Sequence, residues 1–357
     1  MGVGNNKNRY RLAVLSVMLL IGLSCSIAAA APTNITACGI FGAGSYLVAN
    51  NISSAGITCL TFNAGPVTLD LNGFTVSGSG FTNGVLATSV PNVTVRNGTI
   101  TGFARSIYAT GAGAVIDGVR ALTGTSANGI TVGPNSTIEN CLVSGHTAGG
   151  IVASNSATVV NNTLTGNTGN TIIVGDSSLV KGNRLSFNTG GSTDAIRIPA
   201  NSKVVDNVIL GNSFGIHGTG LKNLISGNTI TNCVEGIIVG NDTTITGNNV
   251  SENTDNGIEA GVQCLISGNN ASDNTNVGIT SGINTLFLNN VASNNGNFGI
   301  HVNSGGSAIG NLTDFNGASG LEVGCPSKVD NNTALSNVAP NLDTSGAGCL
   351  LTNNLAP

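Results

Sequence analysis

The sequence predicts an all-β solenoid, a right-handed parallel β-helix with about 21 residues per coil and three short strands in each coil. Two observations predict it. One aliphatic residue leads each coil, and the last six spacings between these residues are all 21. Short segments that alternate apolar and polar residues follow each of them and are separated by Gly, Asn, Ser and Thr, as turns separate strands. The leading residues are Val85, Ile107, Ile130, Ile151, Ile172, Ile196, Ile216, Ile237, Ile258, Ile279, Ile300, Leu321 and Leu342.

The composition agrees with a solenoid and excludes other classes. Only 8% of the residues are charged, 52 are Gly and none is Trp, which is too apolar for a disordered chain and too poor in helix-forming residues for a helical one. A repeat array grows in one dimension, so we expect the 357 residues to form one elongated domain, and a monomer.

Residues 1–30 have the features of a secretory signal peptide. A basic start is followed by the apolar run Leu12–Leu23 and by the cleavage site Ala28–Ala30. This predicts a protein that is secreted, periplasmic or at the cell surface. A lipoprotein anchored through Cys25 is the weaker alternative, because Gly22 stands where an aliphatic residue is expected.

The remaining chain is acidic. The segment 1–30 holds three of the 12 basic residues, which leaves nine against 16 acidic ones. This balance argues against nucleic acid and against an anionic membrane surface as partners. No later segment approaches the about 20 consecutive apolar residues of a membrane helix, so we expect no membrane insertion after cleavage.

The mature chain divides into two parts. Residues 31–83 alternate apolar and polar residues less regularly, which predicts a cap with the first, irregular coils, and residues 84–357 hold the β-helix repeats. With the leading residue as position 0, positions 0 and +2 face the core. Further core residues are expected near +8 (Val159, Val180, Ile245, Ile266, Phe287, Val329 and Leu350) and near +13 (Leu164, Leu185, Ile209, Val250 and Leu355).

Asparagines recur at two further positions of the coil. Asn tolerates the left-handed backbone of a bend, and stacked copies can form hydrogen bonds between their amides, so each column predicts an Asn ladder at one corner. Cys141, Cys233 and His146 occupy ladder positions in their coils and are expected to be corner residues. The columns are Asn162, Asn183, Asn207, Asn228, Asn248, Asn269, Asn290, Asn311, Asn332 and Asn353 near +11, and Asn167, Asn188, Asn212, Asn253, Asn274, Asn295, Asn316 and Asn337 near +16.

The chain resembles a known family in two segments, Leu69–Phe74 and Val95–Phe103, and in the repeated Gly-Ile and Gly-Asn-Asn motifs. It resembles the bacterial right-handed parallel β-helix repeat proteins of the pectin-lyase-like superfamily, over essentially all of the mature chain. The resemblance implies the fold. It implies activity only loosely, because that superfamily contains lyases, hydrolases and epimerases of acidic polysaccharides and also members without assigned chemistry.

Seven cysteines follow residue 30. Export permits disulfides, and both ends of a solenoid need fastening, so we expect the pairs Cys38–Cys59 and Cys325–Cys349, with three thiols left free. No C-x-x-C motif occurs, so a zinc site is not expected, and no dense cluster of Asp and Glu supports Ca²⁺. We therefore expect no metal and no cofactor.

The outward position +1 carries the candidate functional residues. It contains six ionisable residues in a chain where charge is scarce, in one stripe on one sheet. Arg197, His217, His301 and Glu322 are the catalytic candidates, because His and Glu can exchange a proton and Arg can neutralise a uronate. An insertion, residues 189–194, directly precedes Arg197. The substrate-binding candidates are Tyr108, Arg197, His217, Glu259 and Asp343.

Three functions remain open at this point. The leading hypothesis is an exported protein that binds a polysaccharide or cell-surface glycan along the +1 stripe. The second is a lyase or glycosidase acting on acidic polysaccharide, against which stand the missing Asp-Asp pair of polygalacturonases and the missing Ca²⁺-binding cluster of pectate lyases. The third is a structural surface spacer, since exposed strand positions are where a soluble protein places its charges.

Overall fold

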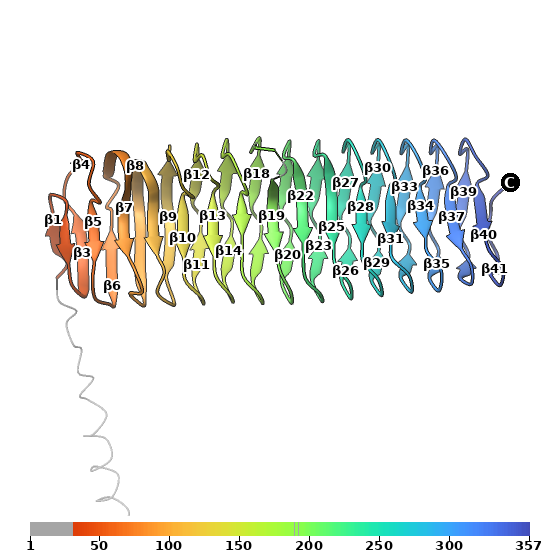
Figure 1. The fold of residues 1–357 in the computed structure, drawn as a ribbon, viewed down its shortest axis with the longest axis horizontal. Helices are drawn as coiled ribbons and strands as arrows, with labels where there is room; N and C mark the ends of the chain where they lie inside the picture. Colours follow the sequence, from red (N-terminus) through yellow and green to blue (C-terminus); the bar gives the residue numbers. More distant parts are fainter. Residues whose placement is uncertain (1–30, 189, 192) are drawn as a thin grey trace, which may run out of the picture. The chain divides into compact units, whose positions relative to one another are not determined.

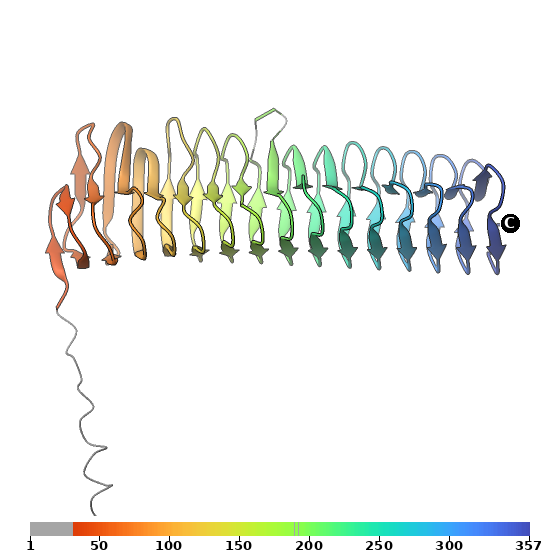
Figure 2. The ribbon, with the colours of Figure 1, turned by 60° about the horizontal axis from the view of Figure 1, so that its bottom comes forward.

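The computed structural model describes residues 31–188, 190–191 and 193–357, and it confirms the predicted parallel β-helix. The predicted signal peptide, residues 1–30, and two residues of the insertion, Thr189 and Ser192, lie outside the described residues. Thr33–Pro357 form one unit of about 15 coils, stacked along one axis in Figures 1 and 2. Every strand pairing is parallel, and regular coils pair about 21 residues apart. None of the described residues forms a helix with the length and apolarity to cross a membrane.

The strands form three faces. Three long strands, β7 (Thr75–Ala87), β8 (Val93–Ala109) and β9 (Val115–Leu122), run through more than one face in the early coils. The first face contains the leading residues and consists, besides β7 and β8, of β2 (Gly39–Phe41), β5 (Leu60–Phe62), β10 (Ile130–Val132), β13 (Ile151–Ala153), β16 (Ile172–Ile173), β19 (Asp194–Ile198), β22 (Phe214–Gly218), β25 (Glu235–Val239), β28 (Ile258–Ala260), β31 (Ile279–Ser281), β34 (Ile300–Val302), β37 (Leu321–Gly324) and β40 (Leu342–Ser345).

The other two faces are built in the same way. The second face contains, besides β8 and β9, the strands β1 (Thr33–Ile35), β3 (Gly44–Val48), β6 (Val67–Asp70), β11 (Thr137–Glu139), β14 (Thr158–Val160), β17 (Leu179–Lys181), β20 (Lys203–Val205), β23 (Leu224–Ser226), β26 (Thr244–Thr246), β29 (Leu265–Ser267), β32 (Leu286–Leu288), β35 (Ser307–Ile309), β38 (Lys328–Asp330) and β41 (Leu350–Thr352). The third face contains, besides β7, β8 and β9, the strands β4 (Ile52–Ser54), β12 (Leu142–Ser144), β15 (Thr163–Thr165), β18 (Arg184–Ser186), β21 (Val208–Leu210), β24 (Thr229–Thr231), β27 (Asn249–Ser251), β30 (Asn270–Ser272), β33 (Val291–Ser293), β36 (Leu312–Asp314) and β39 (Thr333–Leu335).

The core runs along the axis between the three faces. In all coils but the last, positions 0 and +2 are buried, because alternate residues of a strand point to opposite sides. The residues expected near +8 and +13 are buried in the same coils. In the last coil the prediction is wrong. One extra residue shifts its register, so that Leu351, not Leu350, pairs with Val329. No described coil covers this end, and Leu350 and Leu355 are 58% and 56% exposed.

Both predicted Asn ladders are present. At a typical position, Asn248 donates an amide hydrogen bond to Asn269 in the next coil, at 2.9 Å, and accepts hydrogen bonds from the main chain and amide of Asn228 in the preceding coil, both at 2.9 Å. Cys141 and His146 occupy ladder positions as expected, because their backbone N–H groups donate to the next Asn, and so does that of Cys233. In the shifted last coil the ladder residue is Asn354, at 2.9 Å from Asn332, and the assignment to Asn353 is corrected.

A third ladder, at position +6, was not predicted. Its hydroxyl groups accept hydrogen bonds from the backbone N–H of the preceding coil, as Ser136 does from Ala114 and Ser178 does from Ala157, both at 3.1 Å. Cys264 occupies this column, and its backbone N–H donates to Thr285 Oγ1 at 3.2 Å. This position explains the cysteine that sequence reasoning left without a role.

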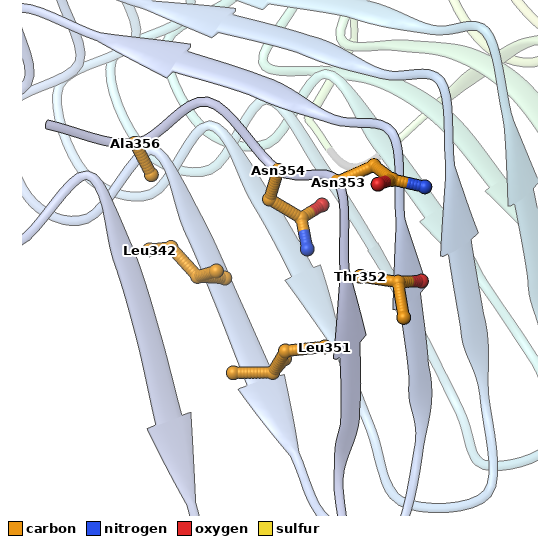
Figure 3. A pocket seen from close by; sticks show the side chains of 6 residues that line it. All are labelled: Leu342, Leu351, Thr352, Asn353, Asn354 and Ala356. Atoms are coloured by element: carbon orange, nitrogen blue, oxygen red, sulfur yellow. The ribbon is translucent and has the colours of Figure 1, made fainter.

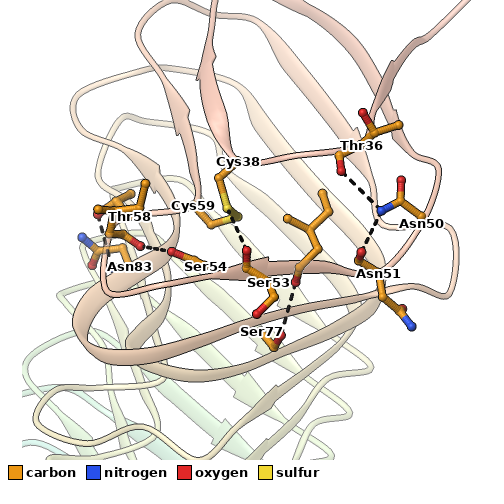
Figure 4. Close-up of a disulfide and its surroundings, with 12 residues drawn as sticks. Thr36, Cys38, Asn50, Asn51, Ser53, Ser54, Thr58, Cys59, Ser77 and Asn83 are labelled. Carbon is orange, nitrogen blue, oxygen red and sulfur yellow. Dashed lines mark hydrogen bonds between the residues drawn. A yellow bond between two sulfur atoms is a disulfide. The ribbon is translucent and has the colours of Figure 1, made fainter.

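Both expected disulfides are present. Cys38 and Cys59 stand directly before the paired strands β2 and β5, which brings their Cα atoms to 4.4 Å (Figure 4). Cys325 and Cys349 join the last coils, with Cα atoms 5.0 Å apart. The other three cysteines of the described residues, Cys141, Cys233 and Cys264, are free and buried.

Candidate functional site

The predicted +1 stripe forms one continuous outward row on the first face. Each member pairs with the member of the next coil, because the register of the first face is kept from β8 to β40. Neighbours along the row are therefore about 4.8 Å apart along the axis. The row reads Tyr108, Thr131, Val152, Ile173, Arg197, His217, Ile238, Glu259, Thr280, His301, Glu322 and Asp343.

A second row lies beside the first, at position −2 of each coil. Position −1 between them is usually Gly and faces inward: a Cβ atom on Gly236 would lie 2.2 Å from Val250 Cγ1. Side chains at −2 and +1 of one coil therefore meet on the surface, as Arg105 does with the ring of Tyr108 at 4.9 Å. We call these two rows the two-row strip. The −2 row reads Arg105, Asn128, Gly149, Asn170, Asp194, Phe214, Glu235, Asn256, Val277, Phe298, Ser319 and Pro340.

The first cluster of the strip is centred on a buried carboxylate. Asp194 is only 6% exposed and accepts a hydrogen bond from His217 Nδ1 at 3.0 Å. Its other oxygen lies 3.9 Å from Arg197 Nε. The backbone N–H of Asp194 donates to the Asn170 amide at 2.7 Å, which fixes the end of the insertion. The structure thus brings the predicted Arg197 and His217 together through a residue that was not predicted.

The hydrogen bond to Asp194 raises the pKa of His217 above its ordinary value. Glu235 stands in the −2 row of the coil after that of Phe214. Burial raises the pKa of Glu235, and Coulombic repulsion from Glu259 and Asp255 raises it further. Glu259 itself accepts a hydrogen bond from Asn256 at 3.2 Å. The cluster therefore contains the ion pair of His217 with Asp194 and, next to it, the carboxylates of Glu235, Glu259 and Asp255.

The second cluster is built around His301. Its Nδ1 atom lies 3.3 Å from Thr280 Oγ1, and its ring centroid is 5.8 Å from that of Phe298 in the −2 row. Glu322 pairs with His301 in the next coil, and its Oε2 atom is buried without a hydrogen-bond partner among the described residues. Asp343 is the exposed next member of the row.

The two clusters are separate. Four coil steps lie between His217 and His301, which is about 19 Å at the strand spacing. Arg197 and His217 can act together, and so can His301 and Glu322, but the four catalytic candidates do not meet in one centre. Tyr108 lies four coils before Arg197, so it belongs to neither cluster.

Sequence reasoning missed the −2 row altogether. Asp194 and Glu235 belong to it, and so do the two aromatic rings of Phe214 and Phe298. The i, i+3 spacing across an inward-facing glycine is the signal that could have found them.

A hollow at the C-terminal end has no such chemistry. It is lined by Leu342, Leu351, Thr352, Asn353, Asn354 and Ala356, none of which is ionisable (Figure 3). This hollow is the open end of the core, because the last described coil is uncovered, and we do not take it as the site.

Comparison with known proteins gives a family match. A family model described as "Periplasmic copper-binding protein (NosD)" matches residues 48–221 and 199–312. No curated protein matches the chain.

Solved structures with a similar fold include two from Azotobacter vinelandii. The mannuronan C-5 epimerase AlgE4 A-module has 12% sequence identity and a TM-score of 0.47, with 91% of each chain covered. The AlgE6 A-module has 15% identity and a TM-score of 0.45, with 92% of each chain covered. The Dettilon tailspike protein (gp208) has 15% identity and a TM-score of 0.44, with 81% of this chain and 59% of that chain covered.

Proposed function

This chain belongs to the NosD family, and from this premise we propose that it is an exported, periplasmic β-helix protein that binds a glycan along the two-row strip. The observation that supports this most directly is the strip itself. It places aromatic rings, imidazoles, amides and carboxylates in two straight, regularly spaced rows on one face. A polymer of repeated units can be held by such rows over several coils.

The chemistry of the strip suits sugars. A sugar ring has an apolar face that packs on aromatic side chains, and hydroxyl groups that exchange hydrogen bonds with amides, imidazoles and carboxylates. Phe214, Phe298 and Tyr108 supply rings, and Asn256 with Glu259 supplies a fixed pair of polar groups. Tyr108 is the one aromatic residue of the +1 row, and the −2 row adds the two phenylalanine rings.

The charges of the strip favour an uncharged glycan over a polyanion. From Arg105 to Asp343 the two rows contain five carboxylates, Asp194, Glu235, Glu259, Glu322 and Asp343, against two guanidinium groups. A chain of uronates would bring further negative charge to this surface. This weighs against the alternative function, a lyase or glycosidase acting on acidic polysaccharide.

One observation favours catalysis as a second candidate. A histidine whose Nδ1 is held by a buried carboxylate, as His217 is by Asp194, is the arrangement of a general base. A catalytic protein would release new reducing or unsaturated ends from its glycan, whereas a binding protein would not.

The residues of this chain do not fit the copper that the family description names. Copper sites in proteins are built mainly from His, Cys and Met. The structure describes no group of three or more His, Cys, Asp or Glu residues placed to hold a metal ion, and Met1 and Met18 lie outside the described part. Burial raises the pKa of Cys141 to about 12 and that of Cys233 to about 11, which keeps both thiols protonated. No step of the proposed function involves copper.

A binding panel tests the proposal. The mature protein is titrated with neutral polymers (glucans, mannans, chitin oligomers) and acidic ones (alginate, polygalacturonate), and reducing and unsaturated ends are assayed in the same samples. We expect binding of a neutral polymer, weakened in Arg197→Ala/His217→Ala, without new ends. Release of ends would establish the catalytic candidate, and no binding to any polymer would leave the surface spacer as the function.

A further inference from the structure

The tetrapeptide Phe-Gly-Ile-His occurs twice in the chain, as residues 214–217 and as residues 298–301. Both copies stand at the same four positions of their coils, −2 to +1, in strands β22 and β34 and the residues before β34. They contain two of the three histidines of the protein. Among the members of the two-row strip, only these two coils combine a phenylalanine in one row with a histidine in the other.

In both copies the glycine between Phe and His separates two outward side chains. The glycine between Phe and His must face inward in both, because a Cβ atom on Gly215 would lie 2.3 Å from Gly236 O and one on Gly299 would lie 2.6 Å from Gly320 O. The Phe and His side chains of both copies therefore point outward from the same strip, and all four are partly exposed. At the second copy the two rings are 5.8 Å apart and inclined by 40°.

Both imidazoles are held by the same nitrogen. Nδ1 of His217 is bound by Asp194 at 3.0 Å, and Nδ1 of His301 lies 3.3 Å from the hydroxyl of Thr280. In each case the partner belongs to the preceding coil. This fixes the orientation of each ring and leaves Nε2 for a ligand, since no described residue forms a hydrogen bond with it. Each copy thus offers an aromatic ring and one hydrogen-bonding nitrogen at the same two positions of its coil.

The separation of the copies determines what could occupy both. Four coil steps amount to about 19 Å along a straight row. A monosaccharide or disaccharide reaches only one copy, whereas an extended chain of several sugars reaches both. Two linked contacts bind a common ligand far more tightly than either contact alone, because the second contact forms intramolecularly.

We propose that the two Phe-His pairs are equivalent subsites for one glycan chain, each of which takes one sugar ring against its phenylalanine and one hydroxyl group on its histidine. The inference rests on the proposed function and adds a minimum ligand length to it. Glu235, Asn256 and Glu259 lie between the subsites and contact the intervening sugars.

Calorimetric titration with oligosaccharides of increasing length tests the inference. The probes are the di-, tetra-, hexa-, octa- and decasaccharides of β-1,4-linked mannose and of N-acetylglucosamine. The variants are Phe214→Ala, Phe298→Ala and the double variant. Phe315→Ala is the matched control, because Phe315 is 62% exposed at a corner outside the strip. Circular dichroism confirms that each variant is folded.

We expect the affinity to rise in one step, at least about tenfold, when the chain becomes long enough to span both subsites. Each single variant should remove the step and change the affinity for the short oligomers by no more than about twofold, since one intact subsite remains. The double variant should lose binding at every length, and the control should behave as the wild type.

The outcomes separate the two proposals. A wild type that binds the polymer but shows equal affinity for short and long chains overturns the paired subsites and leaves glycan binding intact. Single variants that keep the step do the same. A wild type that binds none of these oligomers and no polymer of the panel overturns both.

Discussion

Two histidines of this protein have pKa values displaced in opposite directions by their surroundings. His146 is fully buried at a corner of the coil, and burial lowers its pKa to about 4. Its Nδ1 atom has no hydrogen-bond partner among the described residues. His217 is partly exposed, and its hydrogen bond with Asp194 raises its pKa. Protonation of His146 at low pH should therefore destabilise the fold. The protonation of His217, in contrast, depends on the negative charge of Asp194.

We predict that His146→Asn removes an acid sensitivity of the fold. The folded pKa lies below the value of 6.5 in the unfolded chain, so stability is complete above pH 6.5 and is lost as the pH falls towards 4. With about 1.4 kcal/mol per pKa unit, the loss on full protonation is roughly 3 kcal/mol. The variant places an asparagine at this position, as in the other coils of the same Asn ladder. Urea denaturation between pH 7 and pH 4 gives the free energy of unfolding of both proteins. If this free energy depends on pH in the variant as it does in the wild type, His146 is not the source of the acid sensitivity.

We predict that Asp194→Asn lowers the pKa of His217, because the hydrogen bond to the carboxylate is the largest cause of its elevation. In the wild type this pair contributes stability that is complete below the unfolded pKa of His and is lost as the pH rises through the raised folded pKa. NMR titration of the imidazole protons measures the change directly. The control is Asp343→Asn, in the same row but six coils away, which should leave the titration of His217 unaltered.

The Asn ladders hold the corners of neighbouring coils together, and their energetic weight can be tested at one position. We predict that Asn248→Ala destabilises the protein by about 1–3 kcal/mol, because it leaves the buried N–H of Asn228 without an acceptor. The adjacent Asn249 is exposed, and Asn249→Ala should change the free energy of unfolding by less than about 0.5 kcal/mol. Equal effects of the two substitutions in denaturant unfolding would argue against a ladder role.

The regular elements could be predicted because the coil repeats. The lead residue, the core positions and both Asn ladders depend on a fixed period, and the structure confirms them up to Asn337. The last coil could not be predicted, because the extra residue before Leu351 becomes visible only through its pairing with Val329. The third ladder was missed because Ser, Thr, Asn and Cys share its column, so that no single residue type marks it.

The candidate site was only half predictable for a similar reason. The +1 row follows from the alternation of a strand, which the sequence displays. The −2 row lies across an inward-facing glycine, where simple alternation no longer says which side chains meet. The contact of Asp194 with His217 also joins two coils, from position −2 of one to position +1 of the next, so neither spacing nor residue type indicated it.

At the scale of the whole solenoid, each coil contacts only its neighbours, so stability is approximately a sum of coil and interface contributions. The coils at the two ends each lack one neighbour within the described chain. At the C-terminal end, β40 and β41 pair on one side only, and Leu351 is 47% exposed although it stands in a core column. Local opening should therefore begin there rather than in the middle.

The disulfide Cys325–Cys349 lies across these last coils, and its removal should loosen them alone. We predict that Cys325→Ser/Cys349→Ser accelerates amide hydrogen exchange in β37, β38, β40 and β41 and leaves the protection of β25 and β28 unchanged. The lost cross-link closes a loop of 24 residues, for which a contribution of about 3 kcal/mol is typical. Cys264→Ser is the control, because it removes a buried thiol but leaves both ends fastened. A uniform rise of amide exchange in all coils would contradict this prediction. It would mean that the interfaces between coils are strong enough to make the solenoid open as one unit. The stability would then not be a sum of coil and nearest-neighbour contributions.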